Sequence, residues 1–173
     1  MEVKMKSRKN QLGFTLIEIM VALAVLTILL AIAVPSFQAM TKNSQILNAA
    51  ESVSNGLAKA RAEAINRNTN VAFALGAGTS WSITQVSDGT VIDSRASKEG
   101  SANVTLTAVD SAGAAVTTVT FNSLGSLVGI SPVAKVDFTA TGADRNLRVT
   151  IGVGGKTQVC DPNLTTGSSP RAC

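Results

Sequence analysis

One uninterrupted apolar segment constrains this chain more than any other feature. Residues 14–34 read FTLIEIMVALAVLTILLAIAV, a run of 21 residues in which Glu18 carries the only charge. An α-helix rises 1.5 Å per residue, so a helix of this length covers about 30 Å, the thickness of the hydrocarbon layer of a bilayer. The segment is therefore long enough and apolar enough to span a membrane as a helix.

The charges that flank this segment predict its orientation. Four cations precede it, Lys4, Lys6, Arg8 and Lys9, whereas the following PSFQAMTKNSQ is weakly charged. The positive-inside rule then predicts a cytoplasmic N-terminus and an exported C-terminal domain. An ordinary secretory signal is the alternative, but its apolar core has 7–15 residues and a small-residue cleavage site follows it. The longer run here favours an uncleaved anchor or an unusual kind of processing.

Glu18 is the residue of this segment that needs an explanation. A carboxylate near the bilayer centre costs about 2.5–3.5 kcal/mol on insertion scales, and less toward the interface. A nearby cation would offset that cost. Cleavage after Gly13 would create an α-amine on Phe14, one helical turn from Glu18, and the amine of a neighbouring subunit would serve equally well. The alternative is that Glu18 lies among lipid headgroups beside Arg8 and Lys9.

The residues around the start of the apolar segment resemble a known processing motif. Gly13-Phe14-Thr15-Leu16-Ile17-Glu18, after a basic leader and before about 20 apolar residues, is similar to the class III signal of type IV prepilins and type II secretion pseudopilins. This resemblance implies cleavage between Gly13 and Phe14 by a prepilin peptidase, followed by N-methylation of Phe14. It also implies that Glu18 neutralises the N-terminal amine of a neighbouring subunit during assembly. The implied partners are the prepilin peptidase, other minor and major pilins, and the bacterial inner membrane.

The helix is predicted to continue beyond the apolar segment, to about Arg67. Pro35 removes one backbone hydrogen bond and is expected to kink it. Apolar residues then recur every three or four positions and form one stripe, Ile46, Ala50, Val53, Leu57, Ala60 and Ala64. The charged residues Lys42, Glu51, Lys59, Glu63 and Arg67 fall mostly off it. This pattern is typical of a helix that packs on a soluble domain, and Asn66, Asn68 and Asn70 mark its end.

From Val71 onward, short alternating runs predict β-strands. The candidate strands are Val71–Leu75, Ser80–Val86, Thr90–Asp93, Asn103–Val109, Val116–Phe121, Lys135–Thr139, Leu147–Val153 and Lys156–Cys160. Asp88-Gly89 and Gly154-Gly155 are two-residue hairpin signals, whereas 111–113 and 123–131 are expected to form longer loops. About 105 residues suffice for one sandwich or twisted sheet against the helix, with Trp81, Phe73, Phe121 and Phe138 as large core residues. A binding role for Trp81 is the alternative.

These patterns predict an α+β fold, in which a long N-terminal helix of the pilin kind packs on an antiparallel β-sheet head. The helix has a transmembrane half and an amphipathic half. The predicted organisation is a leader peptide at 1–13, a transmembrane helix at 14–35, an amphipathic helix at 36–70 and a β-rich periplasmic or extracellular head at 71–173. The expected location is the inner membrane, as a single-pass protein, and after assembly a pilus or pseudopilus.

Cys160 and Cys173 are the only thiols of the chain, and both lie in its tail. Because an exported domain enters an oxidising compartment, they are expected to form a disulfide bond. Metal binding by two cysteines without His is disfavoured, and the spacing is not that of a C-x-x-C redox motif.

Catalysis is not expected. The chain has no His, which removes the commonest general base and zinc ligand, and no nucleophile–base or carboxylate pair stands out by its spacing. We expect no catalytic residue, no metal site and no cofactor. An anchored envelope enzyme is the most distant alternative.

The tail resembles one group within the prepilin family. A Gly-Gly hairpin, then Val-Cys-Asp-Pro, then Pro-Arg-Ala-Cys is similar to the GspH/FimT group, which includes the minor pilins FimU and FimT and the minor pseudopilin GspH. The resemblance implies a minor type IV pilin, a structural subunit in pilus assembly initiation or a tip complex for twitching motility, adhesion or DNA uptake. A GspH-like pseudopilin of type II secretion and a FimT-like DNA-binding pilin for natural transformation are the alternatives.

The cations of the head give the DNA hypothesis little support. The formal net charge is +4, but Lys4, Lys6, Arg8 and Lys9 against Glu2 place +3 of it (4 − 1) in the first ten residues. Candidate phosphate contacts are Arg145, Arg148, Lys156 and Arg171. The resemblance implies that FimT-like DNA binding uses an Arg-rich tail, whereas the corresponding stretch of this chain, residues 167–171, contains one Arg, Arg171. Affinity grows with each phosphate neutralised, so weak binding is the most that these residues predict. The alternative is that Arg145, Arg148 and Arg171 are solvated or pair with nearby Asp residues.

Overall fold

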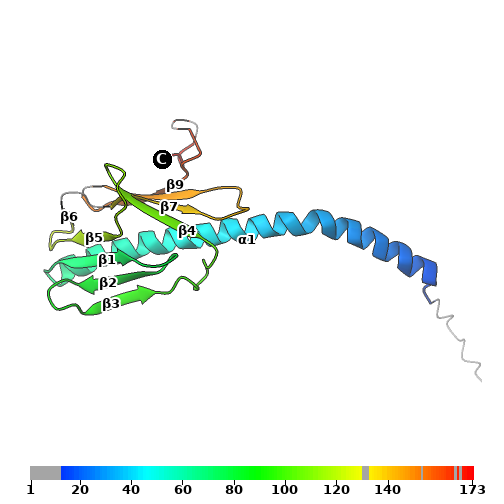
Figure 1. The fold of residues 1–173 in the computed structure, drawn as a ribbon, viewed down its shortest axis with the longest axis horizontal. Helices are drawn as coiled ribbons and strands as arrows, with labels where there is room; N and C mark the ends of the chain where they lie inside the picture. Colours follow the sequence, from blue (N-terminus) through cyan, green and yellow to red (C-terminus); the bar gives the residue numbers. More distant parts are fainter. Residues whose placement is uncertain (1–12, 130–132, 153, 166, 168) are drawn as a thin grey trace, which may run out of the picture. The chain divides into compact units, whose positions relative to one another are not determined.

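The structure, a computed structural model, describes residues 13–129, 133–152, 154–165, 167 and 169–173 (Figure 1). The basic leader, the last residue of the predicted 147–153 strand and the end of the predicted 123–131 loop lie outside the described residues. The chain divides into two compact units, Met1–Phe37 and Gln38–Cys173.

Helix α1 spans Leu16–Asn66, close to the predicted 14–67. It begins after Thr15 because Thr15 caps it: the Thr15 hydroxyl accepts a hydrogen bond from the Glu18 N–H at 3.3 Å. The helix ends where Asn68 takes a positive φ of 50°, a conformation that Asn tolerates better than most residues. Pro35 lies inside α1 and does not end it.

In the first unit, the apolar side chains of α1 are exposed. By its length and composition, this part of α1 could cross a membrane. None of its most apolar stretch is buried within the molecule. Because large apolar side chains seldom face water over so long a stretch, this part of the helix requires an apolar environment from outside the chain.

In the second unit, α1 packs through the predicted stripe. All six stripe residues are buried, which confirms that prediction, and Ala49 and Gly56 are buried with them. Gly56 permits a close approach, since a Cβ atom built there would lie 2.6 Å from the Phe73 ring. The predicted core residue Trp81 is buried against Phe73, with ring centroids 5.5 Å apart, and its Nε1 donates to Ser52 Oγ at 2.9 Å.

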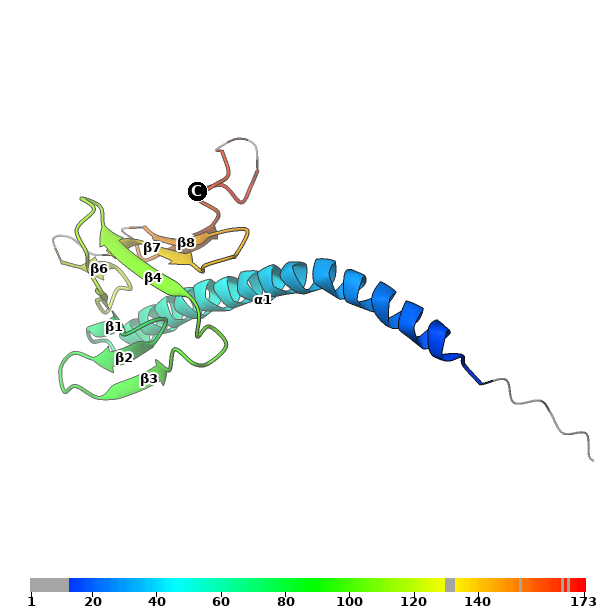
Figure 2. The same ribbon diagram turned by 45° about the vertical axis from the view of Figure 1, so that its right-hand side comes forward.

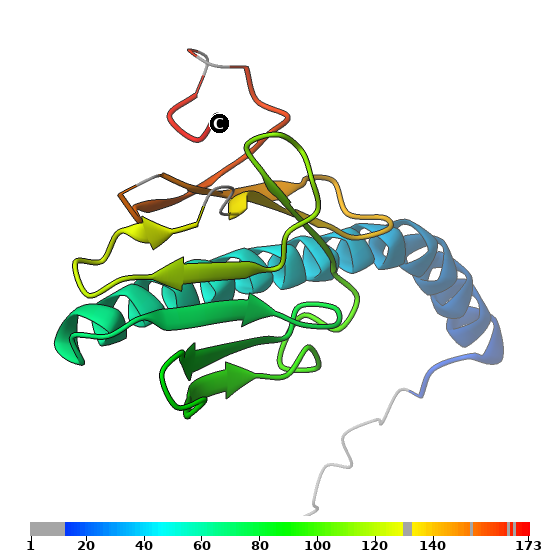
Figure 3. The same ribbon diagram turned by 60° about the vertical axis from the view of Figure 1, so that its left-hand side comes forward.

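The head contains two antiparallel sheets, which confirms the predicted antiparallel β head. The five-stranded sheet has the order β3-β2-β1-β5-β6 and the four-stranded sheet the order β4-β7-β8-β9. In Figures 1 and 2, strands β2 and β3 are drawn below the second half of α1 and strand β7 above it, and in Figure 3 β2 and β3 again lie below the helix. The strands are β1 Val71–Leu75, β2 Trp81–Gln85, β3 Val91–Arg95, β4 Thr105–Asp110, β5 Thr118–Phe121, β6 Leu127–Val128, β7 Val133–Thr139, β8 Leu147–Ile151 and β9 Thr157–Cys160.

All eight predicted strands are present, with ends that move by a few residues, but β6 was missed. It lies in the predicted 123–131 loop and is too short to show a periodic pattern. The two connections predicted as two-residue hairpins are wider, because β2 ends at Gln85 and β3 starts at Val91, while β8 ends at Ile151 and β9 starts at Thr157. In the first, the Gly89 N–H donates to the Gln85 carbonyl at 3.0 Å, which closes a larger loop.

Candidate functional site: the N-terminal segment and the head surface

The predicted cleavage site lies just outside helix α1. Gly13, Phe14 and Thr15 precede the helix, and the Phe14 side chain is 80% exposed. An ideal Cβ on Gly13 would meet no atom within 4 Å. A peptidase must reach the scissile peptide in a non-helical conformation, so this position suits cleavage between Gly13 and Phe14.

Glu18 takes part in a capping box that the sequence analysis did not identify. Besides the Thr15 hydroxyl contact, the Thr15 N–H donates to Glu18 Oε2 at 3.5 Å. Thr followed three residues later by Glu, ahead of an apolar run, is the sequence pattern of this motif, so the chain contained the signal. The carboxylate therefore satisfies an N–H group at the start of α1. Arg8 and Lys9, the alternative headgroup neighbours, lie outside the described residues.

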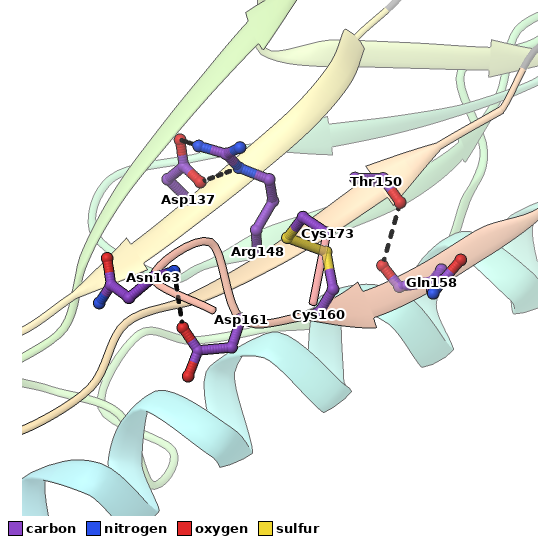
Figure 4. Close-up of a disulfide and its surroundings, with 8 residues drawn as sticks. All are labelled: Asp137, Arg148, Thr150, Gln158, Cys160, Asp161, Asn163 and Cys173. Carbon is purple, nitrogen blue, oxygen red and sulfur yellow. Dashed lines mark hydrogen bonds and ion pairs between the residues drawn. A yellow bond between two sulfur atoms is a disulfide. The ribbon is translucent and has the colours of Figure 1, made fainter. Parts of the chain in front are cut away.

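The candidate phosphate contacts do not form one patch. Arg148 is held by Asp137 on the neighbouring strand: its Nε donates to Oδ1 at 2.6 Å and its Nη2 to Oδ2 at 3.1 Å (Figure 4). This hydrogen-bonded contact raises the pKa of Arg148. Lys156 lines a hollow beside Arg61, whereas Arg145 and Arg171 line a different hollow. Because the Asp137 carboxylate neutralises the Arg148 guanidinium, Arg148 adds little net positive charge for binding a phosphate.

The predicted disulfide bond joins Cys160 and Cys173, with Cα atoms 5.0 Å apart (Figure 4). It closes the loop 161–172 at the end of β9. The same closure is held by the Asp161 N–H, which donates to the Arg171 carbonyl at 2.7 Å. At the start of the loop, the Asn163 N–H donates to Asp161 Oδ1 at 2.9 Å (Figure 4). The two ends of the tail are thereby held together at the end of β9.

Within the described residues, no group of three or more His, Cys, Asp or Glu side chains is placed to hold a metal ion. The chemistry that the described geometry supports is that of a substrate for processing and of a subunit in an assembly.

Three features together define a protein of the pilin class. One half of the helix is apolar and exposed, the other half packs on antiparallel sheets, and the sequence Gly-Phe-Thr-Leu-Ile-Glu stands where the helix begins. The family model for the type II transport protein GspH matches residues 49–155, and the model for the prokaryotic N-terminal methylation motif matches residues 8–34. The chain belongs to the GspH family and carries the methylation motif. No curated protein matches it significantly.

Two solved structures share the fold. The type IV minor pilin FimU of Pseudomonas aeruginosa matches with a TM-score of 0.51 and 20% identity, over 78% of this chain and 98% of FimU. The minor pseudopilin EpsH of the Vibrio cholerae type 2 secretion system matches with a TM-score of 0.51 and 17% identity, over 69% of this chain and 99% of EpsH. At these identities the matches show a common fold.

Proposed function

We propose that this chain is a minor type IV pilin, a structural subunit that takes part in the initiation or the tip complex of a pilus. The observation that carries the proposal is the combination, in one helix, of an exposed apolar half after the methylation motif and a half packed on a head of the GspH family. The apolar half can be stored in the inner membrane and later transferred into the core of a filament.

The proposed sequence of events uses three residues of the N-terminal segment. The prepilin peptidase cleaves the peptide bond after Gly13 on the cytoplasmic face, and the new amine of Phe14 is methylated. Glu18 then neutralises the N-terminal amine of a neighbouring subunit. Two opposite charges that are costly to bury singly are buried more readily as a pair, so this contact sets the register of assembly.

The proposed orientation places residues 1–13 in the cytoplasm and the head at 71–173 in the periplasm. The basic residues of the leader and the positive-inside rule support this orientation. The Cys160–Cys173 disulfide bond also supports it, because disulfides persist in oxidising compartments. The chain is proposed to catalyse nothing itself; the covalent chemistry is done to it.

A minor pseudopilin of type II secretion is the second candidate, and the description of the matching family favours it. The two functions share the fold, the processing and the use of Glu18. They differ in the machine that the subunit joins. A FimT-like role in DNA uptake has less support, because Arg148 is held by Asp137 and the tail contributes one Arg.

Two measurements test the proposal. Mass spectrometry of the mature protein should find a methylated Phe14 at its N-terminus, and a different first residue would contradict the processing. Deletion of the gene should reduce surface pili and twitching while secretion of exoproteins continues. Loss of secretion with normal pili would instead establish the pseudopilin function.

A further inference from the structure

The contact between α1 and the rest of the head begins abruptly along the helix. Within the second unit, residues 38–41 are mostly exposed, Lys42 and Asn43 are half-buried, and Ile46 is the first buried residue of α1. From Ile46 onward, the apolar stripe holds the helix in the core. The turn at residues 42–45 lies before the stripe, so polar contacts and not apolar burial hold it on the head.

The loop 140–146 between β7 and β8 supplies the first of these contacts. Lys42 Nζ donates a hydrogen bond to the Thr141 carbonyl at 2.6 Å. Asn43 and Asp144 form a reciprocal pair: Asn43 Nδ2 donates to Asp144 Oδ2 at 3.3 Å, and the Asp144 N–H donates to Asn43 Oδ1 at 3.0 Å. The loop is thus joined to two successive residues of the helix.

The loop 140–146 is preformed for this contact. Ala140 and Ala143 pack against the core, and the Ala143 N–H donates to the Ala140 carbonyl at 3.1 Å. Gly142 has a φ of 76°, which favours glycine. A Cβ atom built on Gly142 would lie 2.8 Å from Lys42 Nζ, so a side chain there would displace the ammonium group.

The loop 96–104 between β3 and β4 holds the same turn of α1 at another residue. Asn103 Nδ2 donates to Gln45 Oε1 at 3.3 Å. This loop is fixed to the head by the hydroxyl groups of Thr79 and Ser101, which lie 2.7 Å apart and are both buried. Its grip on α1 therefore starts from a rigid base.

The two loops hold opposite faces of the helix. Asn43 and Gln45 are two positions apart, and residues with this spacing do not share a face of an α-helix. Segments that are distant in the sequence therefore enclose the first turn of α1 on the head. We call the six residues that make these contacts the collar: Lys42, Asn43, Gln45, Asn103, Thr141 and Asp144.

The hydrogen bonds of the collar are exposed to solvent. Such bonds add little to the global stability of the head, because water competes for the same groups. The core beyond Ile46 is held by buried apolar contacts instead. The collar can therefore open as a local event while the rest of the head stays folded.

We propose that the collar is a latch that keeps the first turn of α1 on the head while the apolar part of the helix moves from the membrane into a filament. A pull on the apolar part travels along α1 and reaches the collar before it reaches the buried stripe. The interval from Val34 to Lys42 is about 12 Å of helix and stays constant only while the collar is closed. The inference rests on the proposed function as a membrane-stored filament subunit.

Opening of the collar is measured by the rate at which a maleimide labels Ile46→Cys in the full chain in membranes. Ile46 is buried, so a thiol there reacts when the first turn leaves the head, whereas the native cysteines are joined in a disulfide bond. Asn43→Ala removes both bonds of the reciprocal pair and should speed the labelling about tenfold. Because Ala is the better helix former, faster labelling would not reflect a weaker helix.

Three controls separate opening of the collar from other effects. Ser44→Ala changes the same turn, but Ser44 Oγ donates to the Met40 carbonyl within the helix at 3.0 Å, so the labelling rate should not change. Asp144→Asn keeps the N–H donor and a side-chain oxygen acceptor, and its rate should stay close to that of the wild type. Labelling of Ala60→Cys, in the buried part of the stripe, should not respond to Asn43→Ala.

The role in assembly has its own readout. With cleavage unchanged, Asn43→Ala should lower the amount of the chain in sheared fibres by about twofold or more relative to Ser44→Ala, because only the closed fraction is competent. Labelling of Ile46→Cys that is insensitive to Asn43→Ala, equal acceleration at Ala60→Cys, or normal incorporation despite faster labelling would each overturn the inference. Failed cleavage, or absence of the wild-type chain from fibres, would contradict only the proposed function, because the labelling is measured before assembly.

Discussion

Glu18 has two separable properties: its side chain belongs to the capping box with Thr15, and it carries a negative charge within an apolar helix. A glutamine can also complete a capping box, because its side-chain oxygen accepts the same hydrogen bond. It cannot neutralise an amine. The two roles are therefore distinguishable by substitution.

Glu18→Gln should leave the chain folded, inserted and cleaved, but should reduce its incorporation into filaments by more than about tenfold, because removing one partner of a buried charge pair is costly. The measurement is the amount of the protein in sheared surface fibres relative to the membrane fraction. Thr15→Val is the complementary control, since it removes the hydroxyl of the cap and keeps the charge. Normal incorporation of the Glu18→Gln variant would contradict the proposed neutralisation of an amine.

Gly56 is the second informative residue. In the Gly56→Ala variant, the added methyl group overpacks the core against Phe73, which costs about 1–3 kcal/mol. Ala gains roughly 1 kcal/mol in helix propensity, so the head should be destabilised by up to about 2 kcal/mol. Denaturant unfolding followed by the fluorescence of Trp81, the only Trp, measures the change. The control Asn55→Ala, at an exposed position of the same helix, should be neutral or slightly stabilising. A stabilised Gly56→Ala variant would contradict the close packing of α1 against Phe73.

At the scale of elements, two kinds of contact hold segments that are distant in the sequence. The disulfide bond closes the tail on the end of β9. Lys59 of α1 and Asp93 of β3 form an ion pair at 2.7 Å. The first constrains the unfolded chain, and the second depends on pH.

Removal of the disulfide bond by Cys160→Ala with Cys173→Ala should lower the free energy of unfolding by about 3 kcal/mol in the chain-entropy model for a loop of this length. Unfolding of the wild-type head with and without reductant should give the same difference. A change of a few tenths of a kcal/mol would indicate that the unfolded tail is already constrained.

The ion pair predicts a dependence on acid. The hydrogen bond from Lys59 lowers the pKa of Asp93, so its stabilisation is present above about pH 4 and is lost as the pH falls through the lower folded-state pKa. Lys59→Gln should therefore lose less stability than the wild type between pH 6 and pH 3. The effect should be small because both side chains are partly exposed. Identical pH profiles of the unfolding midpoint would contradict this assignment.

At the scale of the whole molecule, the head is a compact unit with its own core, and its cations are dispersed. A fragment without residues 1–41 should therefore retard duplex DNA little at physiological salt, since affinity follows the number of neutralised phosphates. A mobility-shift titration measures this. A micromolar, salt-sensitive complex that Arg171→Ala abolishes would favour the role in DNA uptake.

The sequence by itself predicted the elements that depend on local pattern. Periodicity predicted the stripe from Ile46 to Ala64, the strand Val71–Leu75 and the core position of Trp81. Periodicity is a property of residues that are neighbours in the sequence, so it does not depend on where the element lies in the fold. The disulfide followed from the count of cysteines. The capping box was present in the sequence and was missed, and β6 is too short for any periodic signal.

Pairing between distant segments was decided by the tertiary structure. Arg148 meets Asp137 because β7 and β8 pair in the register that places these residues directly opposite each other, and a shift by one residue would turn them to opposite faces. Likewise, Arg145 and Arg171 share a hollow because the disulfide-closed tail folds back. The apolar segment and its motif determine the class of this protein from the sequence alone. The division of the strands into two sheets, and the surfaces that result, depend on long-range contacts that no local pattern encodes.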